Sequence, residues 1–129
     1  MNIVISDTSD TPIYQQIFEQ IRAQILRGEL PSGAPLPPIR TVALELRISV
    51  ITVKKAWELL EGQGLISTRV GRGTVVSSMS DEQLNITKAD LLQKNLAQSI
   101  QYYRELGFSR EEILKSIQKH LSGDDEGGK

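Results

Sequence analysis

The fold is decided by residues 39–64, which read IRTVALELRISVITVKKAWELLEGQG. Apolar residues recur there at every third or fourth position in two short blocks, a spacing typical of helices that bury one face. The first block covers 39–46, and the second begins after Ser49, whose hydroxyl is suited to cap a helix. Gly62 and Gly64 end the second block. Two short helices joined by a short turn predict a helix-turn-helix.

A longer amphipathic helix is predicted before this unit. Thr11 and Pro12 indicate its start, because a capping hydroxyl precedes a proline at the first helical position. Its buried face is marked by isoleucines at four-residue spacing: Ile13, Ile17, Ile21 and Ile25. Gly28 is suited to end this helix, and the prolines within 31–38 predict an extended connector.

Two short β-prone runs, 65–69 and 74–77, follow the helix-turn-helix. The residues between them, 70–73, read VGRG, and a short glycine-rich connection predicts a β-hairpin. A helix, a helix-turn-helix and a hairpin in this order predict a winged helix.

The next part of the chain is predicted to form two amphipathic helices joined at Gly107. The first helix begins either at Ser80, with Gln83, or at Thr87, with Asp90, because both pairs have the spacing of a capping box. The sequence does not choose between these two starts.

The second of these helices begins at Ser109, which has Glu112 three residues later. Two narrow apolar stripes on such a hairpin bury little alone, so a partner hairpin is expected to cover them in a homodimer. The candidate dimerisation residues are Leu92, Leu96, Ile100, Tyr103, Ile113, Ile117 and Leu121.

Composition excludes several classes of protein. The chain has no cysteine, which removes disulfides and thiolate chemistry, and its single histidine is His120. No metal-ligand cluster and no glycine-rich phosphate loop is visible, so we expect no enzyme activity, no metal and no cofactor. No signal peptide and no run of roughly 18 apolar residues is present, so a cytoplasmic location without membrane contact is expected.

The charge of the chain is unevenly distributed, although its net charge is −1. Between Arg40 and Arg72 there are six basic residues and three acidic ones, whereas from Met79 onward there are seven basic and nine acidic residues. A locally basic middle region predicts a nucleic-acid-binding face on the winged helix.

The second helix of a helix-turn-helix lies in the major groove of DNA, with its N-terminal residues at the base edges. There, Lys54 is a candidate for a guanine or phosphate contact, and Thr52 for a phosphate contact or a helix cap. Val50 and Ile51 either touch thymine methyl groups or pack into the core. Arg40, on the preceding helix, can reach the same groove.

Arg69 and Arg72 flank the tip of the predicted wing. Gly71 either allows close backbone approach to a minor groove or serves turn geometry alone, and both roles are compatible. The full set of candidate DNA contacts is Arg40, Ser49, Val50, Ile51, Thr52, Lys54, Lys55, Arg69, Gly71 and Arg72.

Five runs of residues between about 11 and 77 resemble the GntR family of bacterial regulators. They are PIYQQI at 12–17, ILRGEL at 25–30, LPPIRTVA at 36–43, VKKAWELLEGQGLI at 53–66 and VGRGTVV at 70–76. The short two-helix segment after the wing is similar to that of the YtrA-type branch. This resemblance implies a dimeric repressor, often linked to ABC-transporter genes, without a dedicated effector pocket.

The resemblance also implies DNA contacts at particular residues, which are Arg40, Ser49, Thr52, Lys54 and Gly71. Two residues depart from the family pattern. Val50 stands where the family commonly has arginine, which removes a frequent guanine contact. Arg47 stands in the turn where the family commonly has glycine, and it either adds a phosphate contact or tolerates a strained backbone.

The predicted fold class is mainly α with a small β-hairpin, a winged helix-turn-helix followed by a two-helix dimerisation hairpin. The expected domains are a DNA-binding winged helix at 1–78, a dimerisation element at 79–122 and a disordered tail at 123–129. We expect a regulator, a repressor of a transporter-type operon, that binds a near-palindromic double-stranded DNA operator as a homodimer. The small-molecule effector is unknown, and the protein is expected at the bacterial nucleoid when bound.

Two other interpretations compete with this one. A winged-helix module for protein interaction would show no salt-dependent DNA binding, and the basic wing argues against it. A fragment of the aminotransferase-fused branch of the family is disfavoured because no pyridoxal-binding segment is present.

Overall fold

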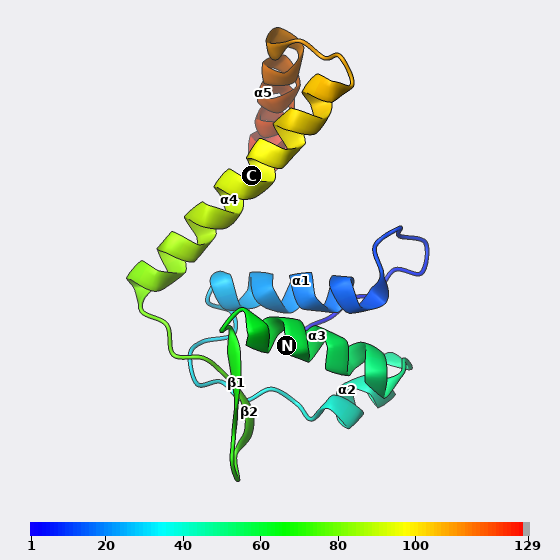
Figure 1. Cartoon of the computed structure of the whole chain (residues 1–129), viewed down its shortest axis with the longest axis vertical. Coiled ribbons are helices and arrows are strands. Elements are labelled where there is room, and N and C mark those ends of the chain that lie inside the picture. Colours follow the sequence, from blue (N-terminus) through cyan, green and yellow to red (C-terminus); the bar gives the residue numbers. More distant parts are fainter. Residues whose placement is uncertain (128–129) are drawn as a thin grey trace. The chain divides into compact units, whose positions relative to one another are not determined.

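The computed structural model describes residues 1–127, with side chains described to Gly123. Its elements are α1 (Ile13–Leu26), α2 (Ile39–Leu46), α3 (Val50–Gly62), β1 (Ile66–Arg69), β2 (Gly73–Val76), α4 (Asp81–Glu105) and α5 (Arg110–Gly127) (Figure 1). The chain divides into two compact parts, the winged-helix unit (Met1–Leu84) and the hairpin unit from Asn85 onward. The predicted fold class is confirmed.

The core of the winged-helix unit forms where α1 and α2 pack against α3. Ile17 and Ile21 of α1 and Leu60 of α3 are completely buried, in agreement with the helical periodicity of the sequence. β1 and β2 pair antiparallel, and the opposed residues Ile66 and Val76 are both buried in this core.

The proline-rich connector is extended, as predicted, and it lies alongside β2. Pro35 forms an isolated antiparallel bridge with Val75, and Leu36 N donates to the Thr74 carbonyl oxygen at 2.9 Å. Val76 N in turn donates to the Ala34 carbonyl oxygen at 2.9 Å. These bonds fasten the wing to the segment that leads into α2.

The structure decides between the two predicted starts of α4. Ser80 N donates to Gln83 Oε1 at 2.8 Å, and Gln83 N donates to Ser80 Oγ at 3.1 Å, which is a reciprocal capping box. The helix therefore begins at Asp81, and Thr87 lies inside it. Ser109 caps α5 as predicted, because its Oγ accepts from Glu112 N at 3.2 Å.

Three predicted boundaries differ from the structure. Pro12 rather than Thr11 occupies the N-cap of α1, without a side-chain cap, because the first helical bond runs from Gln16 N to the Pro12 carbonyl oxygen at 3.0 Å. The first unit extends past 78, since Met79 packs on the core and its N–H donates to Ser32 Oγ at 3.2 Å.

The third difference is at the end of α5, which continues through Gly127 instead of ending at 122. Once a helix has formed, each added residue gains a backbone hydrogen bond, so the helix can extend beyond its apolar stripe. Gly128 and Lys129, which belong to the predicted disordered tail, lie outside the described residues.

The N-terminal segment is held along α1 by a row of glutamine side chains that sequence reasoning missed. Gln20 Oε1 accepts from Val4 N at 2.9 Å and its Nε2 donates to the Val4 carbonyl oxygen at 2.6 Å. Gln24 pairs in the same two-bonded way with Asn2, and Gln16 with Ser6. Four helical residues rise about 6 Å and two extended residues about 6.7 Å, so the amides meet alternate residues of the segment.

The hairpin unit consists of α4 from Asn85 onward and of the whole of α5. From Asn85 to Gly123 no side chain is buried, and Leu92, Leu96, Tyr103 and Leu121 are all exposed. The unit therefore has two amphipathic helices but no core of its own. Within residues 1–127, no helix is both long enough and apolar enough to cross a bilayer.

Candidate nucleic-acid interface

The turn between α2 and α3 is closed by a residue in a left-handed conformation. Arg47 has φ 57° and ψ 47°, and it is the one non-glycine residue with positive φ among residues 1–127. Such a backbone costs roughly 1–2 kcal/mol for a residue with a Cβ. Arginine at this position, where the family commonly has glycine, therefore has the strained backbone that was one of its two predicted consequences. The Arg47 side chain is exposed.

The N-terminus of α3 is capped as the sequence predicts. Ser49 Oγ accepts from Thr52 N at 3.2 Å, and the two hydroxyl oxygens lie 2.7 Å apart. Thr52 thus takes part in the cap through its N–H and its hydroxyl, and its contact with a phosphate stays a prediction. The cap fixes the first turn of α3, the turn from which base contacts are expected.

The two β-branched residues after the cap are outside the core. Val50 is 42% exposed and Ile51 is 78% exposed, whereas Val53, Ala56 and Trp57 form the buried face of the same helix. The alternative that both residues pack into the core is therefore wrong.

The two lysines of α3 have different surroundings. Lys55 Nζ lies 3.9 Å from the centroid of the Tyr14 ring, a cation–π contact that directs it toward the start of α1. Lys54 is exposed. Of the two, Lys54 is the one whose ammonium group is not held against an aromatic ring in the described structure.

Arg40 and Val50 line the same surface hollow of about 480 Å³, together with Ala43, Leu44, Arg47 and Ile48. The structure thus brings together α2, the left-handed turn and the start of α3. Leu44 was missed as a site residue in the sequence, although it follows Arg40 by one helical turn and lies beside the buried Val42 and Ala43. That spacing is the signal that could have found it.

The wing has the geometry that its glycines require. Gly71 and Gly73 have φ of 78° and 73°, and Arg72 N donates to the Arg69 carbonyl oxygen at 3.0 Å. A Cβ built on Gly71 would meet nothing within 4 Å, so its open side is free for close approach by a partner. Arg69, Gly71 and Arg72 are all exposed.

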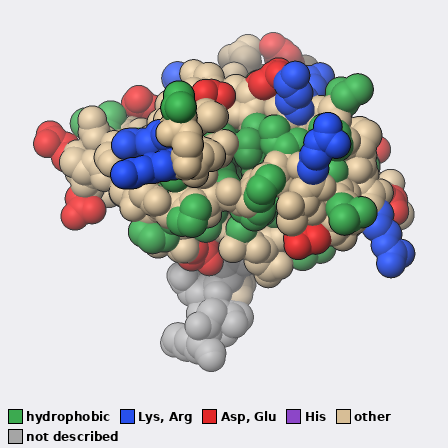
Figure 2. All heavy atoms as spheres, turned by 90° about the horizontal axis from the view of Figure 1, so that it is seen from below, with side chains coloured by type: hydrophobic (Ala, Val, Ile, Leu, Met, Phe, Trp, Pro, Cys, Tyr) green, Lys and Arg blue, Asp and Glu red, His purple; other side chains and the backbone are tan. Residues whose placement is uncertain are grey.

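The basic residues of this face are not neutralised by carboxylates. In the part of the chain that the structure describes, the ion pair present joins Arg27 and Glu29, and Arg40, Arg47, Lys54, Arg69 and Arg72 have no carboxylate partner. Figure 2, a view from the side on which the wing and α2 lie in Figure 1, shows lysine and arginine side chains with exposed hydrophobic ones between them, and a few acidic side chains on the same face. This surface can bind a polyanion and an apolar group together.

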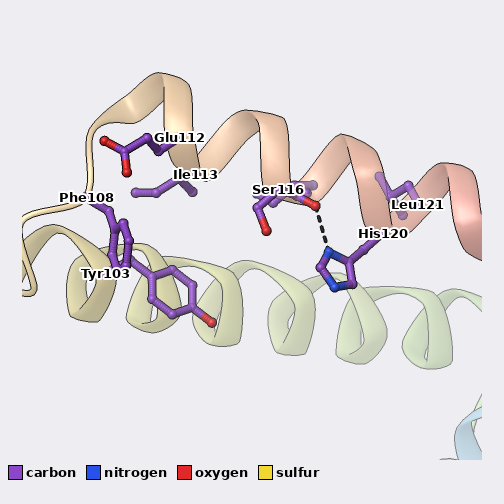
Figure 3. Close-up of a pocket in the computed structure, with 8 residues that line it drawn as sticks. Tyr103, Phe108, Glu112, Ile113, Ser116, His120 and Leu121 are labelled. Carbon is purple, nitrogen blue, oxygen red and sulfur yellow. Dashed lines mark hydrogen bonds between the residues drawn. The ribbon is translucent and has the colours of Figure 1, made fainter.

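The hairpin unit carries a groove of about 630 Å³ between α4 and α5 (Figure 3). Its lining is mostly apolar, with Tyr103 and Phe108 beneath Ile113 at one end and Leu121 farther along α5, and Glu112 and Ser116 add polar atoms. His120 lines the same groove, and its Nδ1 donates to the Ser116 carbonyl oxygen at 2.8 Å. Of the other candidate dimerisation residues, Ile117 is exposed and Ile100 is half-buried. No group of three histidine, cysteine, aspartate or glutamate residues within the described residues could hold a metal ion.

Comparison with known proteins identifies the family. Residues 13–76 match the bacterial regulatory proteins of the gntR family. Over 98% of its length the chain is 35% identical to the HTH-type transcriptional repressor YtrA of Bacillus subtilis (strain 168), and the match spans 97% of that protein. The chain belongs to the GntR family. Members of this family are transcriptional regulators with a DNA-binding helix-turn-helix, and they are not enzymes.

Solved structures support this GntR assignment. YtrA from Sulfolobus acidocaldarius, a GntR-family transcription factor, is 36% identical, with 82% of this chain and 98% of that chain covered and a TM-score of 0.60. A transcriptional antiterminator from Listeria monocytogenes EGD-e is 30% identical, with 94% and 90% covered and a TM-score of 0.73. The two relatives named YtrA are matched over 98% and 82% of this chain, so the resemblance to the short YtrA-type branch is confirmed. The individual DNA and dimer contacts stay predictions.

Proposed function

We propose that this GntR regulator represses transcription by binding duplex DNA through the first turn of α3 and the wing. The observation that carries the proposal is the group of exposed basic residues around the capped start of α3, none of which has a carboxylate partner among the described residues. Their charge is available to phosphates, while the exposed residues of α3 are available to base edges. Similarity to a repressor named YtrA supports repression rather than activation.

The protein acts as a homodimer whose subunits join through α4 and α5. The support is that the hairpin unit buries none of its described side chains, although both helices carry apolar stripes. A two-fold dimer requires a near-palindromic operator, with half-site centres separated by one helical turn, about 34 Å. The resemblance to the YtrA-type branch supports an operon of the transporter type as the target, in the bacterial cytoplasm.

The proposal is tested with the full chain and random duplex DNA. Selection of bound duplexes should recover a near-palindrome, and the logarithm of the affinity should fall linearly with the logarithm of the salt concentration. A protein-interaction module would recover no sequence and show no salt dependence. That result would overturn the proposal.

Two matched variants separate base contacts from phosphate contacts. Lys54→Ala should lose about 1–3 kcal/mol of discrimination at one symmetric pair of base pairs, with little change in affinity for random duplexes. Arg72→Ala should weaken binding to operator and random duplexes alike and reduce the salt slope by about one unit. A uniform loss for Lys54→Ala across all single-base operator variants would make Lys54 a phosphate contact instead.

A further inference from the structure

Three large apolar side chains are exposed where α2 meets the start of α3. Leu44 is 81% exposed, and Val50 and Ile51 follow in the first turn of α3 at the exposures given above. Leu44 and Val50 line the same hollow although they come from different helices, and Ile51 is the next residue along the chain. We call these three residues the apolar face.

The apolar face is bordered by positive charge. Arg40 and Arg47 line the hollow together with Leu44 and Val50, and neither arginine has a carboxylate partner within the described residues. A ligand for this surface must therefore bring an apolar group flanked by anions. Duplex DNA has this chemistry at thymine, whose methyl group projects into the major groove between two phosphate backbones.

The side chains of the apolar face are hydrocarbons and cannot form a hydrogen bond to a base. Arginine or lysine at a reading position selects guanine through two acceptors, whereas valine, leucine and isoleucine distinguish bases only by shape and apolar contact. Of the four bases, only thymine has an apolar group on its major-groove edge.

We propose that Leu44, Val50 and Ile51 recognise the 5-methyl groups of pyrimidines in the operator. This inference rests on the proposed function and names the chemical group that this part of the interface reads. At these base pairs, thymine is preferred because its methyl group is removed from water against the apolar face.

The test replaces thymine by uracil, which removes the methyl group and leaves base pairing and phosphates unchanged. The full chain is titrated with its selected operator and with duplexes in which each symmetric pair of thymines is replaced in turn. Affinity should fall about 4-fold for each methyl group lost, hence about 16-fold for a symmetric pair, at the base pairs beneath α3. Thymines elsewhere in the operator should be replaceable without effect.

A second arm adds the methyl group back on a different base. Cytosine at a reading position should bind as weakly as uracil or more weakly, and 5-methylcytosine should regain about 4-fold for each methyl group. In Leu44→Ala and Ile51→Ala the ratio between thymine and uracil duplexes should approach one at the affected base pairs. Val4→Ala, an exposed apolar residue of the N-terminal segment, is the matched control and should keep the full ratio.

The possible results separate this inference from the proposed function. Sequence-specific, salt-dependent binding with equal affinity for thymine and uracil duplexes would overturn the inference alone. An operator without thymine beneath α3, or a thymine preference that survives both alanine variants, would do the same. Absence of any salt-dependent duplex binding would overturn the proposed function and the inference together.

Discussion

The winged-helix unit and the hairpin unit use their apolar residues in opposite ways. The first gathers fifteen buried apolar side chains from α1, α2, α3, the wing and the connector into one core. The second contains Leu92, Leu96 and Tyr103 on α4 and Leu121 on α5, all exposed. Removal of apolar surface from water is the main favourable term in folding, so the first unit obtains its stability internally. The second can obtain comparable stability only when another surface covers it.

The largest effect should come from the core of the winged-helix unit. Ile21→Ala removes a completely buried side chain between α1 and α3, and it should lower the free energy of unfolding by about 2–5 kcal/mol. Urea denaturation followed by circular dichroism measures this loss. Val4→Ala serves as the control, because an exposed residue should change stability by no more than about 0.5 kcal/mol. A loss below 1 kcal/mol for Ile21→Ala would contradict a core built on this helix.

The hairpin unit should show the reverse pattern. Leu96→Glu combined with Leu121→Glu places charges on exposed apolar residues, which costs the folded monomer little but prevents burial of these residues against a partner. The double variant should be monomeric in light scattering, and its operator affinity should fall about 100-fold because the two half-sites no longer bind as one unit.

Lys94→Glu is the matched control for this experiment, since it changes the charge of an exposed α4 residue that does not belong to the apolar stripe. It should remain a dimer with nearly unchanged affinity. A stable dimer of the Leu96→Glu, Leu121→Glu variant would show that the subunits join elsewhere.

A smaller effect should separate stability from DNA binding inside the winged-helix unit. Arg47→Gly relieves the left-handed backbone at the turn and should raise the free energy of unfolding by about 0.5–1 kcal/mol. The same change removes an exposed guanidinium from the interface, so the salt slope of DNA binding should fall by about one unit. Arg47→Lys keeps both the charge and the strain and should alter neither quantity. Destabilisation by glycine would show that the Arg47 side chain supports the fold.

The sequence predicted those parts of the molecule whose signals are local. The cap at Ser49, the two-strand wing and the buried isoleucines of α1 each follow from residues within a few positions of one another. Local signals do not decide the start of α4, because Ser80 and Thr87 have equivalent partners at the same spacing. In the structure, Met79 is tied to Ser32 far back in the chain, which fixes the chain immediately before Ser80.

The two features that were missed differ in the signal they leave. Leu44 is apolar like its buried neighbours Val42 and Ala43, and its place one helical turn after Arg40 was the available sign that it faces outward. The glutamines of α1 look like a polar surface in the helical pattern. Their role depends on an extended segment that has no periodic signal of its own, so a reading by local patterns could not pair the two.

The smallest effect tests this glutamine row, which holds an N-terminal segment by polar bonds where the rest of the unit is held by apolar burial. Gln20→Ala removes both bonds to Val4, and a typical hydrogen bond contributes about 0.5–1.5 kcal/mol to stability. Because these groups are exposed, we expect a loss near the lower end of that range in urea denaturation.

Hydrogen exchange should show faster exchange of the Val4 amide in Gln20→Ala, while amides in α3 keep their protection. Gln15→Ala removes a glutamine whose side-chain bond, among the described residues, is to Glu19 of the same helix, and it should leave the Val4 amide unchanged. Equal exchange in both variants would mean that Ile3 and Ile5, which pack against the core, hold the segment without help from the glutamines.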